Sequence, residues 1–315
     1  MNQLVSSVGE FKLIERIRKW VPKNAYHVIQ GIGDDAAVVR MARGGLALMT
    51  TDALVEGVDF SFASVSPQQV GRKALAVNLS DIAAMGGDPK YALIALTVPK
   101  KTKTRFVAEF YKGFLRLAKQ LGVNIVGGDL SSGPCWMAAV TVMGETTGKH
   151  PIFRHGARRG DLICVTGDLG GSILGKHHSF LPRLEEGRFL TEFRVHSMID
   201  ISDGLVQDLE HVLVASRAGA DLWLDRIPVS SAAKRLAKNS RGKALHHALS
   251  DGEDFELLVT VDKNRFPSLA FEWKTRFSTP LTAIGCVAGS EPKVNFVEKG
   301  RRVPFRLLKK GFSHF

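Results

Sequence analysis

Apolar and polar positions follow two periods along this chain, one typical of helices and one typical of strands. From Arg105 to Leu121 apolar residues recur every three or four positions and Gly122 follows, which predicts an amphipathic helix that ends there. Residues 68–85 predict a second helix, closed by Gly86, Gly87 and Pro89. Short apolar runs predict strands in LALMTTD (46–52), YALIALTV (91–98), VNIVGGD (123–129) and CWMAAVTVMG (135–144).

The second half repeats this mixture after a turn-rich, charged segment at 146–161. Strands are expected in DLICVTG (161–167), MIDI (198–201), FELLVTV (255–261) and LTAIGCV (281–287), and a helix is expected around residues 205–213. The stretch 176–194 is polar and shows no regular pattern. A chain of 315 residues can bury two cores. We therefore predict an α/β (α+β) protein with domains at 1–148 and 149–315.

The chain carries 43 Lys and Arg against 31 Asp and Glu, a formal net charge of +12. It lacks a basic stripe with interleaved aromatic residues, so a nucleic-acid partner is not expected, and the charge favours anionic small substrates. Charges interrupt the apolar residues at its start, unlike in a secretory signal, so export is not expected. No run approaches the about 18 apolar residues that a membrane span needs. Three cysteines lie far apart without CxxC spacing. A cytoplasmic protein without a membrane partner is the expectation.

Carboxylates recur where an apolar element ends among small residues. They are Asp34 and Asp35 in GIGDDA, Asp52, Asp81, Asp129, Asp200, Asp203, and Glu253 with Asp254. Each one alone also fits a helix cap or a turn residue. Together they predict a site for a cation, because oxygen ligands without His or Cys clusters favour Mg²⁺, which commonly also binds substrate phosphates.

Several nucleotide-binding scaffolds do not fit these motifs. GIGDDA approximates a dinucleotide fingerprint, but two acidic residues at a pyrophosphate site would repel the ligand. The chain has no GxxxxGK[ST] loop and no HRD or DFG sequence of protein kinases. An enzyme of phosphoryl transfer would therefore use another scaffold here.

The ordered motifs resemble thiamine-monophosphate kinases, a family of the aminoimidazole-ribonucleotide synthetase-like superfamily. The similarity covers nearly the whole chain and includes GIGDDAAVV, TTDALVEGVDF, KALAVNLSDIAAMGGDP, VGGDLSSGP, RHGARRGDLICVTGDLGGS, MIDISDGLVQDLEHV, GEDFELLVTV and KGFSHF. The resemblance implies a two-domain fold whose N-terminal mixed sheet dimerises, with a C-terminal α/β domain that completes the active site. It implies phosphorylation of thiamine monophosphate by ATP with several Mg²⁺ ions, in a homodimer.

The resemblance also implies a set of site residues. The metal ligands would be Asp35, Thr50, Thr51, Asp52, Asp81, Asp129, Asp200 and Asp203, of which Asp52, Asp129 and Asp203 would be catalytic. ATP contacts would be Tyr111, Gly128, Asp129, Arg154 and Ser202, and substrate contacts would be Asp59, Glu253 and Phe312. The residues alone leave simpler roles open: Arg154 on the surface, Tyr111 in the core, Phe312 as an apolar anchor, and Thr50 and Thr51 as ordinary strand residues.

Two features depart from the family's pattern. Asp251 stands where a small residue is usual, and residues 171–198 follow the family only loosely. Two alternatives therefore remain. One is another ATP-using superfamily enzyme, such as a selenophosphate synthetase or a hydrogenase-maturation protein, although Cys135, Cys164 and Cys286 are internal and do not supply the terminal cysteine chemistry of those enzymes. The other is a nucleotide-binding homologue without activity.

Overall fold

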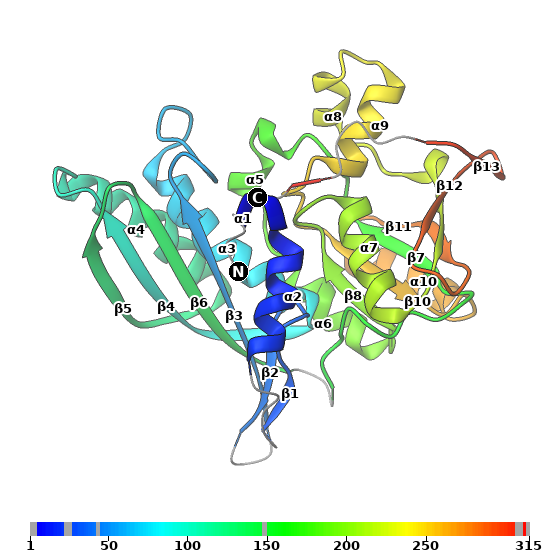
Figure 1. Cartoon of the computed structure of the whole chain (residues 1–315), viewed down its shortest axis with the longest axis horizontal. Coiled ribbons are helices and arrows are strands. Elements are labelled where there is room, and N and C mark those ends of the chain that lie inside the picture. The colour runs from blue at the N-terminus through cyan, green and yellow to red at the C-terminus, as the bar shows by residue number, and fades with distance from the viewer. Residues whose placement is uncertain (1–4, 22–26, 42–44, 147–149, 306–310, 313–315) are drawn as a thin grey trace.

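The computed structural model describes residues 5–21, 27–41, 45–146, 150–305 and 311–312, and it forms two lobes, each built on one sheet (Figure 1). The helices are α1 (Val5–Val8), α2 (Glu10–Trp20), α3 (Pro67–Ala84), α4 (Thr104–Leu121), α5 (Lys176–Ser179), α6 (Leu184–Glu192), α7 (Leu205–Ser216), α8 (Ser231–Leu236), α9 (Arg241–Ser250) and α10 (Phe266–Arg276). The strands are β1 (Val28–Gln30), β2 (Ala37–Arg40), β3 (Leu46–Val55), β4 (Gly87–Val98), β5 (Asn124–Ser132), β6 (Met137–Thr146), β7 (Leu162–Thr166), β8 (Ser197–Asp200), β9 (Ala220–Trp223), β10 (Leu257–Val261), β11 (Leu281–Val287), β12 (Val294–Glu298) and β13 (Arg301–Val303).

The first sheet has the strand order β1-β2-β3-β6-β4-β5. Its strands pair antiparallel except β4 and β5, which are parallel and joined by α4. Side chains alternate between the two faces of a strand. Leu48 and Ile94 are buried on the face that carries the helices, whereas Met49 and Leu93 are 42% and 45% exposed on the other. We call this second, uncovered side the outer face.

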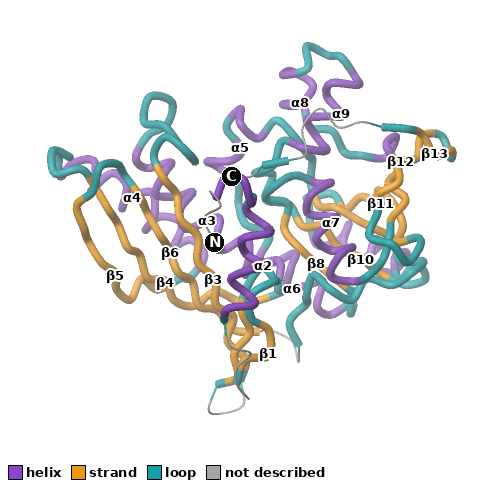
Figure 2. Tube along the Cα trace, viewed as in Figure 1, coloured by secondary structure: helices purple, strands orange, loops and turns teal. Residues whose placement is uncertain are grey.

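The second sheet has the order β13-β12-β9-β11-β7-β10-β8. Its central strands are buried along their length, as the continuous apolar run LLVTV of β10 indicates. In Figure 2 the strands of the two sheets form two groups, and α2, α3 and α6 lie between them in that view. Among the described residues no helix is long and apolar enough to cross a lipid bilayer.

Helix α3 is the central element, because 13 of its 18 residues are buried. Ser66 caps its start by accepting a hydrogen bond from the backbone N–H of Gln69, and Pro67 occupies the first turn. The helix contacts β3, β4 and β6 of one lobe and α5, α6 and β8 of the other. Residues on every side of α3 are therefore held in fixed positions relative to both lobes.

Two glycines allow α3 and α4 to pack closely. A Cβ on Gly71 would collide with the carbonyl oxygen of Phe110, and a Cβ on Gly113 would collide with that of Gln68. Only glycine permits such an approach of two backbones. The packing of α4 on α3 therefore depends on the absence of both side chains.

The structure confirms most of the predicted elements and corrects two of them. No element was predicted in the polar stretch 176–194, but α5 and α6 lie there and both contact α3, with Gly187 of α6 close to the backbone of Ala83. Gly87 and Pro89 do not close a helix end but belong to β4, where a bulge near Pro89 accommodates the missing N–H. The division at 148/149 stays a prediction; β6 ends at Thr146 and β7 begins at Leu162.

Candidate active site

Three carboxylates from distant segments meet beside α3. Asp35 comes from the loop before β2, Asp81 from the last turn of α3, and Asp200 from the end of β8. Each offers an oxygen within 4.8 Å of the other two. We call these three residues the acid cluster. Such a grouping costs free energy by mutual repulsion unless protons or cations neutralise it.

Neutral donors fix the orientation of the acid cluster. The hydroxyl of Thr50 donates to Asp81 Oδ2 over 2.5 Å, and that of Ser80 donates to Asp200 Oδ2 over 2.6 Å. Asp52 is placed by its backbone N–H, which donates to Asn78 Oδ1 over 3.0 Å. Helix α3 thus carries Asp81, and through Ser80 and Asn78 it also orients Asp200 and Asp52.

Burial raises the pKa values of the acid cluster. The pKa of Asp200 is raised to about 8, first by burial and then by the carboxylates of Asp35 and Asp52, against the hydrogen bond from Ser80. Burial also raises the pKa of Asp81 well above its ordinary range, and Asp52, Asp200 and Asp35 add to this rise. The cluster therefore holds protons near neutral pH, and a cation bound there would displace them.

Arg154 lies against the paired aspartates of GIGDDA. Its Nη2 is 2.5 Å from Asp35 Oδ1, and its backbone N–H donates to Asp34 Oδ2 over 3.2 Å. Burial, with repulsion from Asp35, still raises the pKa of Asp34 to about 7. Within the described residues, Asp35 Oδ2 is buried and has no hydrogen-bond partner. The carboxylate of Asp35 thus keeps one oxygen available for a further ligand.

A second acidic group lies at the start of α7. Asp203, Asp208 and His211 have ligand atoms within 4.8 Å of one another. Asp208 accepts the backbone N–H groups of Asp203 and Gly204, both over 3.1 Å. Burial lowers the pKa of His211 to about 4, so its ring is neutral at pH 7. The two hydrogen bonds to Asp208 hold the backbone of the loop that follows Asp200.

A cavity of about 620 Å³ is lined by residues that contact that loop. Asp59, Glu253 and Phe312 line it, although they come from three distant segments. The backbone N–H of Glu253 donates to the carbonyl of Ser202 over 2.6 Å, two residues after Asp200. The cavity wall and the acid cluster are therefore connected through the segment 200–202.

Comparison with known proteins identifies the family. The model of the AIR synthase related protein, N-terminal domain, matches residues 33–148. The thiamine-monophosphate kinase of Buchnera aphidicola subsp. Schizaphis graminum is 34% identical, over 98% of this chain and 99% of its own, and that of Rhodopirellula baltica is 42% identical, over 83% and 84%. The chain belongs to the thiamine-monophosphate kinase family.

Solved structures agree with this membership. The structure described as AaThiL complexed with AMPPCP and TMP has a TM-score of 0.84 and 30% identity, with all of both chains covered. A HypE-HypF complex has a TM-score of 0.73 at 17% identity, which shows the fold alone. Thiamine-monophosphate kinases and HypE therefore share this two-sheet architecture.

The structure brings together only some of the site residues that the family resemblance implies. Asp35, Asp81 and Asp200 form the acid cluster, and Thr50, Asp52 and Arg154 lie against it. Asp59, Glu253 and Phe312 line the cavity. Ser202 and Asp203 lie between the two groups, since Ser202 accepts from Glu253 and the carbonyl of Asp203 accepts from the N–H of Phe312.

Asp129 lies elsewhere in the same chain. It pairs with Ala95 of β4, and Ala95 is aligned with Ala139 of β6 and then Ala53 of β3. Three steps of about 4.8 Å place it about 14 Å from Ala53. Asp129 is exposed on the outer face, opposite to α3. Its place in a metal site stays a prediction that a single chain does not fulfil.

Gly128, Thr51 and Tyr111 also lie apart from the acid cluster. Gly128 precedes Asp129 in β5, and Thr51 donates to the carbonyl of Val140 on the outer face. Tyr111 packs against Phe110 and Phe114 of α4, with ring centroids 5.7 and 6.2 Å away. Their contacts with ligands stay a prediction.

Sequence reasoning missed several residues of this region. Lys73 is fully buried in α3, and its Nζ lies 2.5 Å from Glu253 Oε1. His177 and His178 also line the cavity, with ring centroids 3.5 Å apart. Asp251, which the sequence analysis did single out, accepts the backbone N–H of Gly171 over 2.9 Å and pairs with His247. A lysine inside the otherwise apolar run KALAVNL was the available signal for Lys73.

Proposed function

We propose that this chain transfers the γ-phosphoryl group of ATP to the phosphate of thiamine monophosphate, giving thiamine diphosphate and ADP. One observation carries the proposal. Residues 200–202 connect the acid cluster, which contains Asp200, to the cavity whose wall contains Glu253, and this cavity is large enough for the substrate. Membership of the thiamine-monophosphate kinase family supports the same reaction. The solved relative described as a complex with AMPPCP and TMP supports both substrates.

The cavity suits the thiamine part of the substrate. Asp59 and Glu253 place carboxyl groups in its wall, which complements the positive thiazolium ring, and Phe312 offers a flat surface for stacking. Lys73 neutralises part of the charge of Glu253 from inside α3. We propose that Asp59, Glu253 and Phe312 bind thiamine monophosphate with its phosphate directed toward Asp200.

The acid cluster suits Mg²⁺. Its donors are carboxylate oxygens and a threonine hydroxyl, and one buried oxygen of Asp35 has no hydrogen-bond partner among the described residues. Mg²⁺ bound there would neutralise phosphate charge that opposes the attack of one phosphate on another. We propose Asp35, Thr50, Thr51, Asp52, Asp81, Asp129, Asp200 and Asp203 as ligands, with Asp52, Asp129 and Asp203 essential for transfer.

The remaining acceleration comes from positioning. The attacking oxygen of a phosphate monoester is already ionised near neutral pH, so the chain needs no general base. Arg154 is held by Asp34 and Asp35 where its guanidinium group can face a phosphate, and Ser202 lies at the junction of the two parts. We propose Arg154, Ser202, Gly128, Asp129 and Tyr111 as contacts to ATP.

The outer face supports a homodimer. Met49, Tyr91, Leu93 and Met137 are 42%, 42%, 45% and 37% exposed there, which is unusual for a sheet in contact with water. Pairing of two outer faces would bury these residues and would place Asp129 at the interface. We propose that residues 1–148 dimerise and bind ATP and metal, and that residues 149–315 complete the site.

A direct assay tests this function. Purified protein is incubated with ATP, Mg²⁺ and thiamine monophosphate, and thiamine diphosphate is measured by chromatography. Product that disappears with EDTA is the expected result. ATP binding without thiamine diphosphate, under conditions where a known thiamine-monophosphate kinase is active, would reject the proposed substrate.

A further inference from the structure

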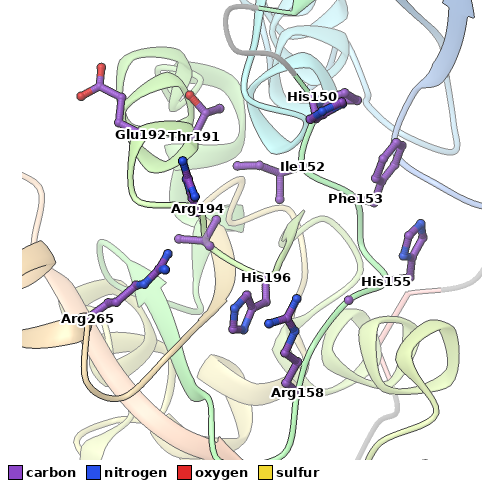
Figure 3. A pocket seen from close by; sticks show the side chains of 13 residues that line it. His150, Ile152, Phe153, His155, Arg158, Thr191, Glu192, Arg194, His196 and Arg265 are labelled. Carbon is purple, nitrogen blue, oxygen red and sulfur yellow. The ribbon is translucent and has the colours of Figure 1, made fainter.

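A second large cavity lies away from the acid cluster, with a volume of about 750 Å³ (Figure 3). Three segments form it: residues 150–158, which connect the two sheets; residues 191–196, at and after the end of α6; and Arg265, at the start of α10. We call it the basic pocket.

Cationic groups dominate the lining of the basic pocket. Arg158, Arg194 and Arg265 line it, and within the described residues none of the three forms an ion pair. Among the described lining residues Glu192 alone is acidic, and in Figure 3 its carboxylate points away from the other labelled side chains. The carboxylate of Asp262 acts on Arg265 and His196 from the neighbouring turn, but it does not line the pocket. Three guanidinium groups around one cavity attract an anion, because each presents several donors that fit phosphate oxygens.

Specific contacts order the backbone of Arg158 and the side chains of His196 and Arg265. Asp161 Oδ2 accepts the backbone N–H of Arg158 and lies 2.8 Å from His196 Nδ1. Arg265 donates to the carbonyl of Phe193 over 3.4 Å. Arg194 has a φ of 49°, a conformation that is uncommon for a residue with a side chain, and it lies two residues after the end of α6. The rings of Phe153 and His155 are stacked at 5.0 Å and form the opposite side in Figure 3.

The basic pocket is separate from the acid cluster, although one segment serves both. Phe153 and His155 line the pocket, whereas Arg154 between them extends to Asp34 and Asp35. None of the lining residues belongs to the acid cluster or to the cavity that contains Phe312. A ligand of the basic pocket would therefore lie on one side of the segment 153–155, and the acid cluster lies on the other side.

We infer that the basic pocket binds a small molecule with a pyrophosphoryl group, as a site distinct from the phosphoryl-transfer site. Arg158, Arg194 and Arg265 bind the phosphate oxygens, and His196 adds a further donor. The stacked rings of Phe153 and His155 provide a flat surface for a base, so free pyrophosphate and a nucleoside diphosphate share the chemistry that the pocket recognises.

Calorimetric titration tests the site without any turnover. Pyrophosphate, and separately ADP, is titrated into the protein in EDTA, which removes metal-dependent binding at the acid cluster. The double variant R194A/R265A removes two cations of the pocket, and R105A/R116A removes two exposed arginines of α4 as a matched control. We expect saturable binding that weakens roughly tenfold or more in R194A/R265A and stays within about twofold of the wild type in the control.

The outcomes separate this site from the kinase activity. Binding of ADP that is tighter than that of pyrophosphate and that weakens in R194A/R265A would place a base on Phe153 and His155, and tighter binding of pyrophosphate would identify pyrophosphate as sufficient. Absence of saturable binding to the wild type, or equal losses in both double variants, overturns the site. R194E, with a thermal unfolding curve for each variant, shows whether a loss follows charge rather than misfolding. Thiamine diphosphate formation by R194A/R265A stays unchanged in either case.

Discussion

Lys73 Nζ lies 2.5 Å from Glu253 Oε1, although 180 positions separate the two residues. Lys73 is fully buried in α3, and Glu253 holds a left-handed backbone with a φ of 54° at the cavity wall. A side chain in this conformation persists only when its surroundings fix it. The central helix therefore sets the position of a carboxylate that we assign to substrate binding.

Replacing Lys73 with Met should weaken both the fold and substrate binding. Glu253 keeps partial access to water, so the loss of stability should be modest, about 1 to 3 kcal/mol. The KM for thiamine monophosphate should rise more than kcat falls, because Lys73 positions a binding group. Urea unfolding and steady-state kinetics measure the two effects. In a double-mutant cycle, K73M/E253Q should be more stable than the sum of the single losses predicts; strict additivity would contradict the pair.

Asp81→Asn should abolish phosphoryl transfer and leave the metal-free fold intact. The substitution removes one of three carboxylates that repel one another, so thermal stability in EDTA should stay the same or rise. Activity should fall more than a hundredfold, by loss of a metal ligand. Asp225→Asn, on an exposed aspartate, serves as the control. A variant Asp81→Asn that keeps near-normal activity would refute the acid cluster as a metal site.

Stability without metal should decrease as pH rises. The pKa of Asp200 is about 8 and that of Asp34 about 7 in the folded chain, both above the ordinary value of 3.8, because of burial. The folded state then binds more protons than the unfolded state between about pH 4 and 8, so unfolding becomes easier across this window. Thermal unfolding at several pH values in EDTA measures the slope. Mg²⁺ or Asp200→Asn should reduce it, and a slope of the opposite sign would disprove the assignment.

Gly113→Ala should destabilise the fold strongly. Its Cβ would meet the carbonyl of Gln68, so α3 and α4 must move apart, at a cost of about 2 kcal/mol or more. Gly242→Ala is the matched control, since Gly242 also lies in a helix and has open space around it. That substitution should be neutral or stabilising by up to about 1 kcal/mol. Urea unfolding of both variants gives the comparison, and equal losses would contradict the close packing.

The sequence predicted most elements because their periods were clear, as in α4 with Phe110, Phe114 and Leu117 on one face. It failed at residues 176–194, where α6 is short and carries buried Glu186 and Gly187 among its apolar residues. Tertiary contact with α3 stabilises that helix, and a local pattern cannot show such contact.

The residue types of the site were predictable from the sequence, but the contacts between their side chains were not. The order of motifs indicated Asp35, Asp81 and Asp200, and the structure places them together. Arg154 was expected at a nucleotide, yet it contacts Asp34 and Asp35, which only the folded chain can show. Likewise the alternation in β5 tells that Asp129 and Leu130 face opposite sides, but it does not tell which side the helices cover.

The most direct test of the central claim is transfer of label from [γ-³²P]ATP to thiamine monophosphate in a single turnover, with wild-type protein, Asp52→Asn and Asp129→Asn. We expect labelled thiamine diphosphate from the wild type with Mg²⁺, none in EDTA, and at least a hundredfold less from either variant. Label that appears only as free phosphate, or equal transfer by all three proteins, would contradict it.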